Sequence, residues 1–582
     1  MSFDQSILDK AQEYIRVEES DSFREEVKRL IEGESWDDLK DRFYMELGFG
    51  TGGMRGIIGG GYNRINPYNI RKATQGLASY VKSQTKKENP SAIIAYDSRH
   101  YSNVFSLEAA RVLCGNGIKT YLFRNLRPTP ELSFGVRLLG TDVGIVITAS
   151  HNPPAYNGYK VYWNDGGQVV SPHDQGIIGK VRAVKRIVSM SEEEAVREGL
   201  LLLVDREIDE PYHAMVKRQV LRPELVREKG KELKVVYTPL HGTGAVPIAT
   251  VLGEMGIEVT FVPEQRQPDG SFPTVEYPNP EESSAMKMAV DLGTKIRADL
   301  VMGTDPDADR LGIAVPSKDG FTLITGNQLG VLLADYIFST RKEMGSLPDN
   351  PAFIKTIVTT DLGRLIAEQC GAKCFDTLTG FKYIAAKIRE FESTENGPVY
   401  VFGGEESYGY LIGSEVRDKD AVSAAVLTAE MTLYHLSKKR SLMDRLNELY
   451  GIFGYFQEAQ LSRTFKGEQG FKAMCSLMDR LRSDPPLTWG GRRTEIIRDM
   501  QEGTNRYVSE NRTEETIELP QSNVLQFVLV DDSIITVRPS GTEPKIKFYA
   551  SCRSERGVDL ETARVEVGDK IEKITREIQS LL

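Results

Sequence analysis

Apolar and polar positions follow two different periods along the first part of the chain. Between residues 66 and 140, helical spacing predicts helices near 67–83 and 103–115, and short apolar runs predict strands between them. The predicted strands are Ala92–Tyr96, Lys119–Phe123 and the β-branched run Val143–Ile147. This βαβ order indicates a mainly parallel sheet that is flanked by helices.

A helical segment precedes this unit, and similar α/β units follow it. Residues 5–45 are rich in Glu, Lys, Arg and Leu at helical spacing, which predicts two amphipathic helices packed as an amino-terminal extension. A second unit begins with the strand Lys234–Tyr237, and a third contains the strand Phe353–Thr359. We therefore expect several α/β units along the chain.

Two stretches interrupt the alternation of helices and strands. Charged helices and the apolar run Leu200–Val204 lie between residues 181 and 232, which indicates a junction between domains. Residues 451–520 have mixed charge and a break at Pro485–Pro486, so we interpret them as a linker or insertion. A last, smaller domain follows, and it contains the strand Ser533–Val537.

Length and composition limit the class of protein. A chain of 582 residues is too long for one hydrophobic core and suggests about three to five domains. Its net charge of −10 argues against nucleic acid or an anionic membrane as a partner, whereas local basic residues can still bind a small anion. The five cysteines lack the paired spacing of a disulfide or zinc framework. Without a secretion signal or an apolar run of ~20 residues, a soluble cytoplasmic protein is expected.

A serine loop follows the strand Val143–Ile147. Ligands of open α/β sheets bind at the carboxyl ends of the strands, and Pro153 and Pro154 prevent regular hydrogen bonding directly afterwards. Ser150 is therefore expected on an irregular, accessible loop. The imidazole and amide that follow it suggest an activated or phosphate-bearing hydroxyl, although local sequence alone favours an ordinary turn.

The serine loop also carries a family resemblance. Residues Thr148–Pro154 read TASHNPP, and together with Asn157–Lys160 they resemble the phosphoserine loop of the α-D-phosphohexomutases, the phosphoglucomutase and phosphomannomutase superfamily. Three further segments resemble the other active-site loops of that family, so the likeness covers roughly residues 45 to 550.

The resemblance implies an α/β fold of four domains around a central cleft. Three of these domains have mixed or parallel sheets, and the carboxy-terminal domain is a smaller α+β unit. The expected divisions are a helical extension (1–45), domain I with the phosphoserine loop (46–207), domain II with the metal loop (208–322), domain III with the sugar loop (323–450) and a phosphate-binding carboxy-terminal domain (451–582).

Residues around the serine are expected to assist phosphate transfer. Glycines in the loop 48–56 allow backbone N–H groups to approach an anion, and the resemblance places Arg55 of this loop beside the phosphoserine. It places Lys160 over the reacting hydroxyl, where lysine suits acid–base work if burial and positive neighbours lower its pKa. His151, adjacent to Ser150, is a further catalytic candidate. In isolation, a solvated arginine or lysine is the commoner interpretation.

Three carboxylates form the candidate metal loop. Asp305, Asp307 and Asp309 stand at alternate positions between apolar runs and can converge on one hard cation. An EF-hand is excluded because its sixth position needs glycine, where this chain has Arg310. The resemblance assigns Mg²⁺ to the triplet and to the phosphate on Ser150, with the Arg310 charge beside it. An acidic turn is the alternative, but its carboxylates would repel one another without a cation.

Two loops are expected to contact the sugar. Thr379 and Gly380 precede Lys382, an arrangement similar to the phosphoglucomutase variants of the family, which makes Lys382 a candidate for phosphate contact or proton transfer. Glu405 and Ser407 follow an apolar strand and are expected to hydrogen-bond sugar hydroxyls, as the family's sugar loop does.

The last candidate loop, residues 538–545, reads RPSGTEPK. Arginine, hydroxyl groups and glycine N–H groups can form an anion cradle, and the resemblance assigns this loop to the phosphate that is not reacting. The expected contacts are Arg538, Ser540, Gly541, Thr542 and Lys545. A β-turn with a surface arginine is the plainer alternative.

Together these loops imply an intramolecular phosphotransferase that acts on a phosphosugar. The expected reaction interconverts glucose 1-phosphate and glucose 6-phosphate through a phosphoserine and glucose 1,6-bisphosphate, which also primes the enzyme. Phosphopentomutase and phosphomannomutase are alternatives within the superfamily. From other classes, a sugar-phosphate-binding regulator without catalysis and a serine phosphatase remain as rivals.

Overall fold

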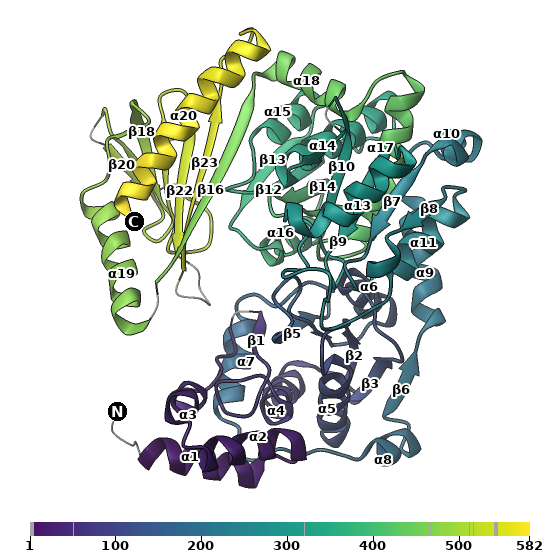
Figure 1. The fold of residues 1–582 in the computed structure, drawn as a ribbon, viewed down its shortest axis with the longest axis vertical. Coiled ribbons are helices and arrows are strands. Elements are labelled where there is room, and N and C mark those ends of the chain that lie inside the picture. Colours follow the sequence, from purple (N-terminus) through teal and green to yellow (C-terminus); the bar gives the residue numbers. More distant parts are fainter. Residues whose placement is uncertain are drawn as a thin grey trace.

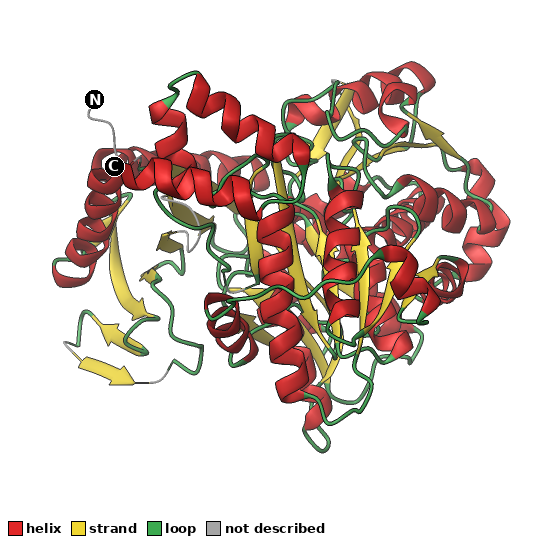
Figure 2. Ribbon diagram, turned by 90° about the horizontal axis from the view of Figure 1, so that it is seen from below, coloured by secondary structure: helices red, strands yellow, loops and turns green. Residues whose placement is uncertain are grey.

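The computed structural model describes residues 5–50, 52–318, 320–465, 467–510, 512–515, 517–539 and 545–582, and it places them in four β-sheets with flanking helices (Figure 1). The amino-terminal unit is the lowest in this view, and the carboxy-terminal sheet lies at the upper left. Seen at right angles, strands lie between helices (Figure 2). Among these residues, no helix is both long enough and apolar enough to cross a membrane.

Residues 5–43, all of which are described, form three helices rather than the two predicted. They are α1 (Gln5–Val17), α2 (Asp21–Glu32) and α3 (Trp36–Phe43). The prediction was wrong because the short polar turns between the helices resemble the polar faces of the helices themselves. A small core joins the extension to the rest of the chain, and its buried members are Ile7, Ala11, Tyr14, Val27, Leu39, Phe43 and Tyr62.

The first sheet has six strands and carries the serine loop. Its elements are β1 (Gly53–Ile57), α4 (Pro67–Gln84), β2 (Ser91–Tyr96), α5 (Ser102–Gly115), β3 (Lys119–Phe123), α6 (Thr129–Leu139), β4 (Val143–Ile147), β5 (Tyr156–Trp163), α7 (His173–Arg182), α8 (Glu192–Arg197) and β6 (Leu201–Val204). The strand order is β1-β5-β4-β2-β3-β6, with β1 and β5 antiparallel to their neighbours. Ile93 and Val146 pack with α6, whereas Ile94 and Ile145 pack with α4 and α5. Burial on both faces explains the continuous apolar runs in the sequence.

Residues 201–204, predicted to mark a domain junction, instead form the edge strand β6. This strand pairs in parallel with β3, where Leu201 lies opposite Thr120 and Val204 opposite Phe123. The apolar run itself therefore belongs to the first sheet, and the junction predicted within residues 181–232 stays a prediction.

The second sheet carries the metal loop. Its elements are α9 (Arg206–Arg218), α10 (Pro223–Lys229), the 3₁₀-helix Gly230–Glu232, β7 (Val235–Thr238), α11 (Ala245–Glu254), β8 (Val259–Phe261), α12 (Pro263–Arg266), α13 (Ser283–Ile296), β9 (Leu300–Thr304), β10 (Leu311–Ser317) and β11 (Gly320–Ile324). The strand order is β11-β10-β9-β7-β8.

The third sheet carries the sugar loop. Its elements are α14 (Gly326–Glu343), β12 (Pro351–Thr356), α15 (Leu362–Gln369), β13 (Lys373–Thr377), α16 (Phe381–Ser393), β14 (Val399–Glu405), β15 (Gly409–Ile412), α17 (Ala421–Ser437) and α18 (Leu442–Phe453). The strand order is β13-β12-β14-β15. One continuous apolar core joins this unit to the second sheet and to the α6 face of the first sheet.

The last unit is a sheet of eight strands. Its elements are β16 (Phe456–Thr464), α19 (Gly467–Ser483), β17 (Thr488–Trp489), β18 (Arg492–Asp499), β19 (Thr504–Tyr507), β20 (Arg512–Glu515), β21 (Leu525–Leu529), β22 (Ile534–Pro539), β23 (Lys545–Arg553) and α20 (Leu560–Leu581). The prediction of a linker or insertion at 451–520 was wrong, because these residues contribute β16 to β20 to the sheet. The strand β16 pairs with β23, far along the chain, and such a pairing leaves no local pattern.

The predicted division into an extension and four units stays a prediction. Three of its breaks, at 207/208, 322/323 and 450/451, fall within α9, β11 and α18. The length of a helix or strand depends on the residues it packs against, and a change in sequence composition does not show where that packing stops.

A glycine turn fixes the extension to the first sheet just beyond β1. Glu26 Oε2 accepts the N–H of Gly60 at 2.7 Å, and Arg42 Nη1 donates to the Gly60 carbonyl at 3.0 Å. The turn lies so close to α2 that a Cβ on Gly60 would be 2.6 Å from Val27 Cγ2 and 2.7 Å from Phe23 O. Only glycine fits this contact without a shift of the helix.

Gly60→Ala is expected to lower the free energy of unfolding by about 1–3 kcal/mol, because the added methyl group overlaps α2. Urea unfolding of the two proteins measures the difference. The control is Gly179→Ala in α7, where nothing lies within 4 Å of the added Cβ and alanine favours the helix. Equal stability of Gly60→Ala and the unsubstituted protein would contradict the close contact.

Candidate active site

Ser150 lies just beyond β4, where its side chain contacts the metal loop of the second sheet. Its backbone has a φ of +52°, and its N–H donates to Thr148 Oγ1 at 2.8 Å. The hydroxyl donates to Asp305 Oδ2 at 2.5 Å and lies 3.2 Å from His151 Nδ1. Ser150 is only 3% exposed. The prediction of an accessible serine was wrong, because the second unit covers the loop.

The two other candidates next to the serine also lie at this loop. Arg55 Nη1 donates to Asn152 Oδ1 at 2.9 Å, so the glycine-dense loop does reach the serine loop. Burial, together with the charges of Arg310 and Arg55, lowers the pKa of His151 well below its usual value. The imidazole is therefore neutral near pH 7 and can share a hydrogen bond with Ser150 Oγ.

The turn between β9 and β10 gathers three aspartates around one point. Asp305, Asp307 and Asp309 are buried, and each offers a carboxylate oxygen within 4.8 Å of the others. Asp305 Oδ1 shapes the turn by accepting the backbone N–H groups of Asp309 and Arg310, both at 3.0 Å. Ala308 takes a φ of +50° in the tight part of the turn.

Unsatisfied oxygens in this cluster indicate a cation site. Asp307 Oδ1 and Asp309 Oδ1 are buried and have no hydrogen-bond partner within the described parts of the chain. A buried carboxylate oxygen without a partner is unfavourable, and a hard divalent cation satisfies it. Three carboxylates and the adjoining Ser150 oxygen therefore suit such an ion, with positions left for water or phosphate.

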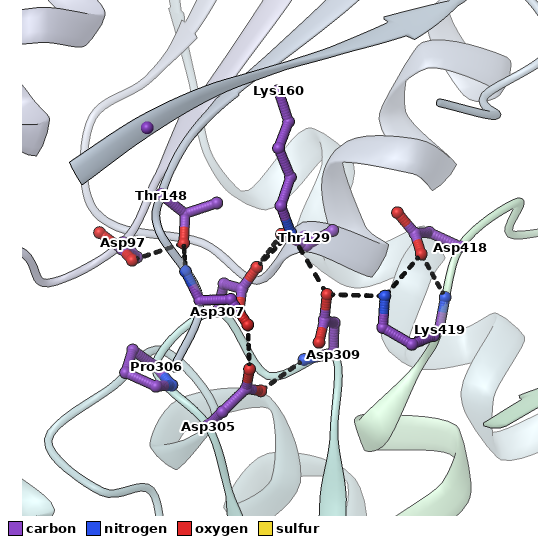
Figure 3. Close-up of polar contacts among 12 residues, drawn as sticks. Asp97, Thr129, Thr148, Lys160, Asp305, Pro306, Asp307, Asp309, Asp418 and Lys419 are labelled. Atoms are coloured by element: carbon purple, nitrogen blue, oxygen red, sulfur yellow. Dashed lines mark hydrogen bonds and ion pairs between the residues drawn. The ribbon is translucent and has the colours of Figure 1, made fainter. Parts of the chain in front are cut away.

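Two lysines from other units balance the charge of the cluster (Figure 3). Lys160 Nζ on β5 lies 2.9 Å from Asp307 Oδ2 and 3.3 Å from Asp309 Oδ2, and Lys419 Nζ, beyond β15, lies 3.0 Å from Asp309 Oδ2. Thr129 at the start of α6 donates its hydroxyl to Asp307 Oδ2 at 2.8 Å. Sequence reasoning missed Lys419 and Thr129, because neither belongs to a distinctive local motif.

These ion pairs alter the expected role of Lys160. Burial alone would lower the pKa of Lys160, but the Asp307 and Asp309 carboxylates raise it above its ordinary value. The predicted role of Lys160 in acid–base work required a lowered pKa. The structure does not meet this condition, because the neighbours of Lys160 are mainly anions. Burial likewise favours neutral Asp309, yet Lys419, Lys160 and an adjacent arginine lower the pKa of this carboxyl. Burial and the Asp307 charge instead raise the pKa of Asp305.

Arg310 lies at the edge of the metal loop. Its guanidinium forms an ion pair with Glu281, and its Nε lies 4.0 Å from Asp309 Oδ1. This Nε is buried and finds no hydrogen-bond acceptor among the described residues. One donor of the predicted substrate contact is therefore buried beside the carboxylates without an acceptor in the described part of the chain.

The two candidate sugar loops meet at one hydrogen bond. Glu405 ends β14, and its Oε1 accepts the N–H of Gly380 at 2.7 Å. Ser407 lies in the turn that follows. Thr379 Oγ1 is a buried atom without a hydrogen-bond partner in the described part of the chain. Burial raises the pKa of Glu405 to about 7, although the Lys419 charge opposes this shift.

Basic residues gather where the third and last units meet. Lys382 near the start of α16 has a pKa lowered by burial and by Arg538 of β22, with Asp174 opposing. Lys545 opens β23, and Lys547 on the same strand was not predicted. Burial lowers the pKa of Lys547, and the Lys545 and Arg538 charges add to this effect. The predicted contacts Ser540, Gly541 and Thr542 lie outside the described residues.

Comparisons with known proteins give the family. Models of the phosphoglucomutase/phosphomannomutase α/β/α domains I, II and III match residues 46–187, 210–318 and 325–453, in that order. A phosphoglucomutase of Staphylococcus haemolyticus is 37% identical over 514 residues, which cover 88% of this chain and 91% of that protein. The chain belongs to the phosphoglucomutase/phosphomannomutase family.

Two further proteins extend the comparison. A Schizosaccharomyces pombe protein named "Probable phosphoribomutase" is 34% identical over 562 residues, 93% of each chain. The solved open form of parafusin, a phosphoglucomutase from Paramecium, has a TM-score of 0.69 at 18% identity and covers 92% of this chain and 95% of its own. This structural likeness concerns the fold alone. The predicted superfamily, α/β fold class and intramolecular phosphotransferase class are confirmed, while the roles of single residues stay predictions.

Mg²⁺ is expected to raise the unfolding temperature, and EDTA to reverse the effect, because an ion that binds only the folded state stabilises it by about 2.7 kcal/mol at a hundred times its Kd. Differential scanning calorimetry measures the shift. Asp307→Asn should lose most of it. The control Asp291→Asn, an exposed residue paired with Lys287 on α13, should keep it. Equal Mg²⁺ shifts in the two variants would argue against the site.

Proposed function

We propose that this member of the phosphoglucomutase/phosphomannomutase family is a phosphoglucomutase that uses a phosphoserine at Ser150 and glucose 1,6-bisphosphate as the intermediate. The observation that carries the proposal is the contact of the Ser150 hydroxyl with three buried carboxylates that suit a divalent cation. Relatives named phosphoglucomutase, 35–37% identical over 88–90% of this chain, agree with the activity predicted from the loops. A phosphosugar is the proposed partner and the cytoplasm the proposed location.

The first half-reaction moves the phosphoryl group from Ser150 Oγ to a hydroxyl of glucose 1-phosphate or glucose 6-phosphate. The Oγ–P bond breaks and a P–O bond to the sugar forms. The proton of the sugar hydroxyl passes to a base of the site, and the Ser150 oxygen takes up a proton from an acid of the site. Lys160 and Arg55 supply fixed positive charge near the transferred group. The Ser150 oxygen that is left behind lies between Asp305 and His151.

The second half-reaction returns the other phosphoryl group to Ser150. Glucose 1,6-bisphosphate turns end for end between the two steps, so each binding loop must accept the sugar in both orientations. Glu405 and Ser407 would hold sugar hydroxyls, and Arg538, with Lys382 and Lys545 nearby, would hold the phosphate that is not reacting. Closure of the last unit over the sugar would exclude water and limit loss of the phosphate.

Asp305, Asp307 and Asp309 are the proposed holders of Mg²⁺. When bound there, the ion supplies a Lewis acid to the phosphoryl oxygens. Lys160 and Lys419 form ion pairs with Asp307 and Asp309 and so offset part of their negative charge. Because Lys160 lies on β5 of the first sheet, its ion pair also holds the metal loop close to the serine loop.

Transfer to a pentose phosphate is a second candidate function. The observation that favours it is the relative named "Probable phosphoribomutase", which matches 93% of this chain. The ratio of kcat/KM for glucose 1-phosphate, mannose 1-phosphate and ribose 1-phosphate ranks the substrates. A regulator without catalysis would bind one of them with no turnover, and a phosphatase would release free phosphate.

Ser150→Ala is expected to abolish turnover and leave the fold intact, because no oxygen remains to carry the phosphoryl group. A coupled assay for glucose 6-phosphate measures turnover, and circular dichroism checks the fold. The control Ser437→Ala on α17, whose hydroxyl donates to the Tyr434 carbonyl of its own helical turn at 2.7 Å, should keep full activity. Mutase activity in Ser150→Ala would refute the phosphoserine role.

Glu405→Gln is expected to raise KM for glucose 1-phosphate more at about pH 8 than at about pH 6. Burial raises the pKa of Glu405 to about 7, so its carboxylate is mostly ionised only above that pH, and the ionised form accepts sugar hydroxyls more strongly. The ratio of KM values at each pH cancels the titration of the substrate phosphate. A ratio that does not change with pH would count against this role.

A further inference from the structure

We infer that Arg99 is a positioning residue that holds the Ser150 loop in its reactive shape. This inference rests on the proposed function of Ser150. Arg99 belongs to none of the predicted motifs, and its side chain is completely buried behind the serine loop, with 0% exposed. Its hydrogen bonds go to backbone carbonyls, whereas Ser150 Oγ contacts Asp305 and His151. Any effect of Arg99 on the reaction must therefore pass through the backbone of the loop.

Four backbone carbonyls of the loop accept hydrogen bonds from one guanidinium. Arg99 Nη2 donates to Ser150 O at 2.5 Å and to Asn152 O, and Nη1 donates to Pro153 O and Tyr156 O at 2.9 Å each. Within this segment the Tyr156 N–H donates to Pro153 O at 3.0 Å, but two prolines and a left-handed serine exclude a regular ladder of main-chain bonds. Arg99 therefore takes the place that a ladder of main-chain bonds has elsewhere.

A carboxylate links Arg99 to the backbone of the serine. Asp97 Oδ2 lies 3.5 Å from Arg99 Nε, which is an ion-pair contact, because this Nε has no hydrogen-bond partner among the described residues. The same oxygen accepts the Thr148 hydroxyl at 2.7 Å (Figure 3), and Thr148 Oγ1 accepts the N–H of Ser150 at 2.8 Å. The two main-chain polar groups of Ser150 are thus both held by the Asp97–Arg99 pair, one directly and one through Thr148.

The opposite side of Arg99 is covered by the unit that carries the metal loop. Its guanidinium lies 5.0 Å from the ring centroid of Phe272, a buried residue with a φ of +46°. Gly270 packs so tightly here that a Cβ would lie 2.6 Å from His100 N and 2.8 Å from Ser98 O. Arg99 therefore fixes the serine loop at the place where the second unit adjoins it. Asp305 of that unit accepts the Ser150 hydroxyl.

Lysine cannot replace this arginine. An ammonium has three donors on one atom, whereas these four carbonyls need four donors on the two terminal nitrogens of a planar fork. Arg99→Lys keeps the charge and most of the volume, and it removes the fork. Small misplacements of a reacting group reduce turnover strongly, so the expected loss of kcat is about 10²-fold, with KM for glucose 1-phosphate unchanged.

The test compares Arg99→Lys with Arg71→Lys in steady-state kinetics with glucose 1-phosphate, and measures the unfolding temperature of both. Arg71 is as buried, at 3% exposed, but its partners are Glu18, Glu19 and Glu108 on the extension and α5. Both variants should lose stability, while only Arg99→Lys should lose kcat. The phosphorylated form of each variant is also compared. The ratio of its hydrolysis rate to kcat should be higher for Arg99→Lys than for Arg71→Lys.

A second variant supplies a chemical rescue. Arg99→Ala leaves a space for a guanidinium, so methylguanidinium at millimolar concentration should restore part of kcat, whereas methylammonium, with the same charge, should not. Restoration by both ions, or an equal kcat loss in Arg71→Lys, would overturn the inference. Unfolding of both Arg99 variants while Arg71→Lys stays folded would show a purely structural role and also overturn it. An inactive unsubstituted protein would instead reject the proposed function.

Discussion

Three buried carboxylates on one short loop repel one another unless positive charge surrounds them. Because their ligand oxygens lie within 4.8 Å of one another, each ionised pair is unfavourable by at least about 3.5 kcal/mol at an effective dielectric of about 20. The compensating charge comes from different parts of the chain, with Lys160 in the first sheet and Lys419 beyond the third. The loop of Asp305, Asp307 and Asp309 is therefore stable where three units meet, and that junction is where Ser150 lies.

The two lysines and the hydrogen bonds of the site do not satisfy every carboxylate oxygen of the metal loop. Two carboxylate oxygens, Asp307 Oδ1 and Asp309 Oδ1, have no hydrogen-bond partner within the described residues, and a cation beside the Ser150 hydroxyl would satisfy them. Irregular backbone near the site is held by buried or half-buried charged side chains. Arg99 satisfies the serine loop, and Glu26 with Arg42 satisfies the glycine turn beyond β1. Side-chain hydrogen bonds thus take over, in these loops, the place of main-chain pairing.

The last unit is attached differently from the first three. A continuous apolar core joins the first three sheets and takes in Phe456 of β16, whereas the rest of the last unit meets the third through a small cluster that includes Ile357, Leu378 and Tyr549. A cavity of about 290 Å³ adjoins this cluster and is lined by Glu406 and Glu458 among others. An interface with such a void suits the closure of the last unit that the proposed function requires.

Features that depend on neighbours along the chain could be predicted from the sequence. The strands Ala92–Tyr96 and Val143–Ile147, the serine loop and the Asp305–Asp309 turn are examples, because periodicity, proline and alternate carboxylates act over a few residues. Features that depend on neighbours in space could not. The pairing of β16 with β23, the contact of Lys419 with Asp309 and the raised pKa of Lys160 come from residues far apart in sequence. Electrostatic fields and main-chain pairing act through space, so they exist only once the chain has folded.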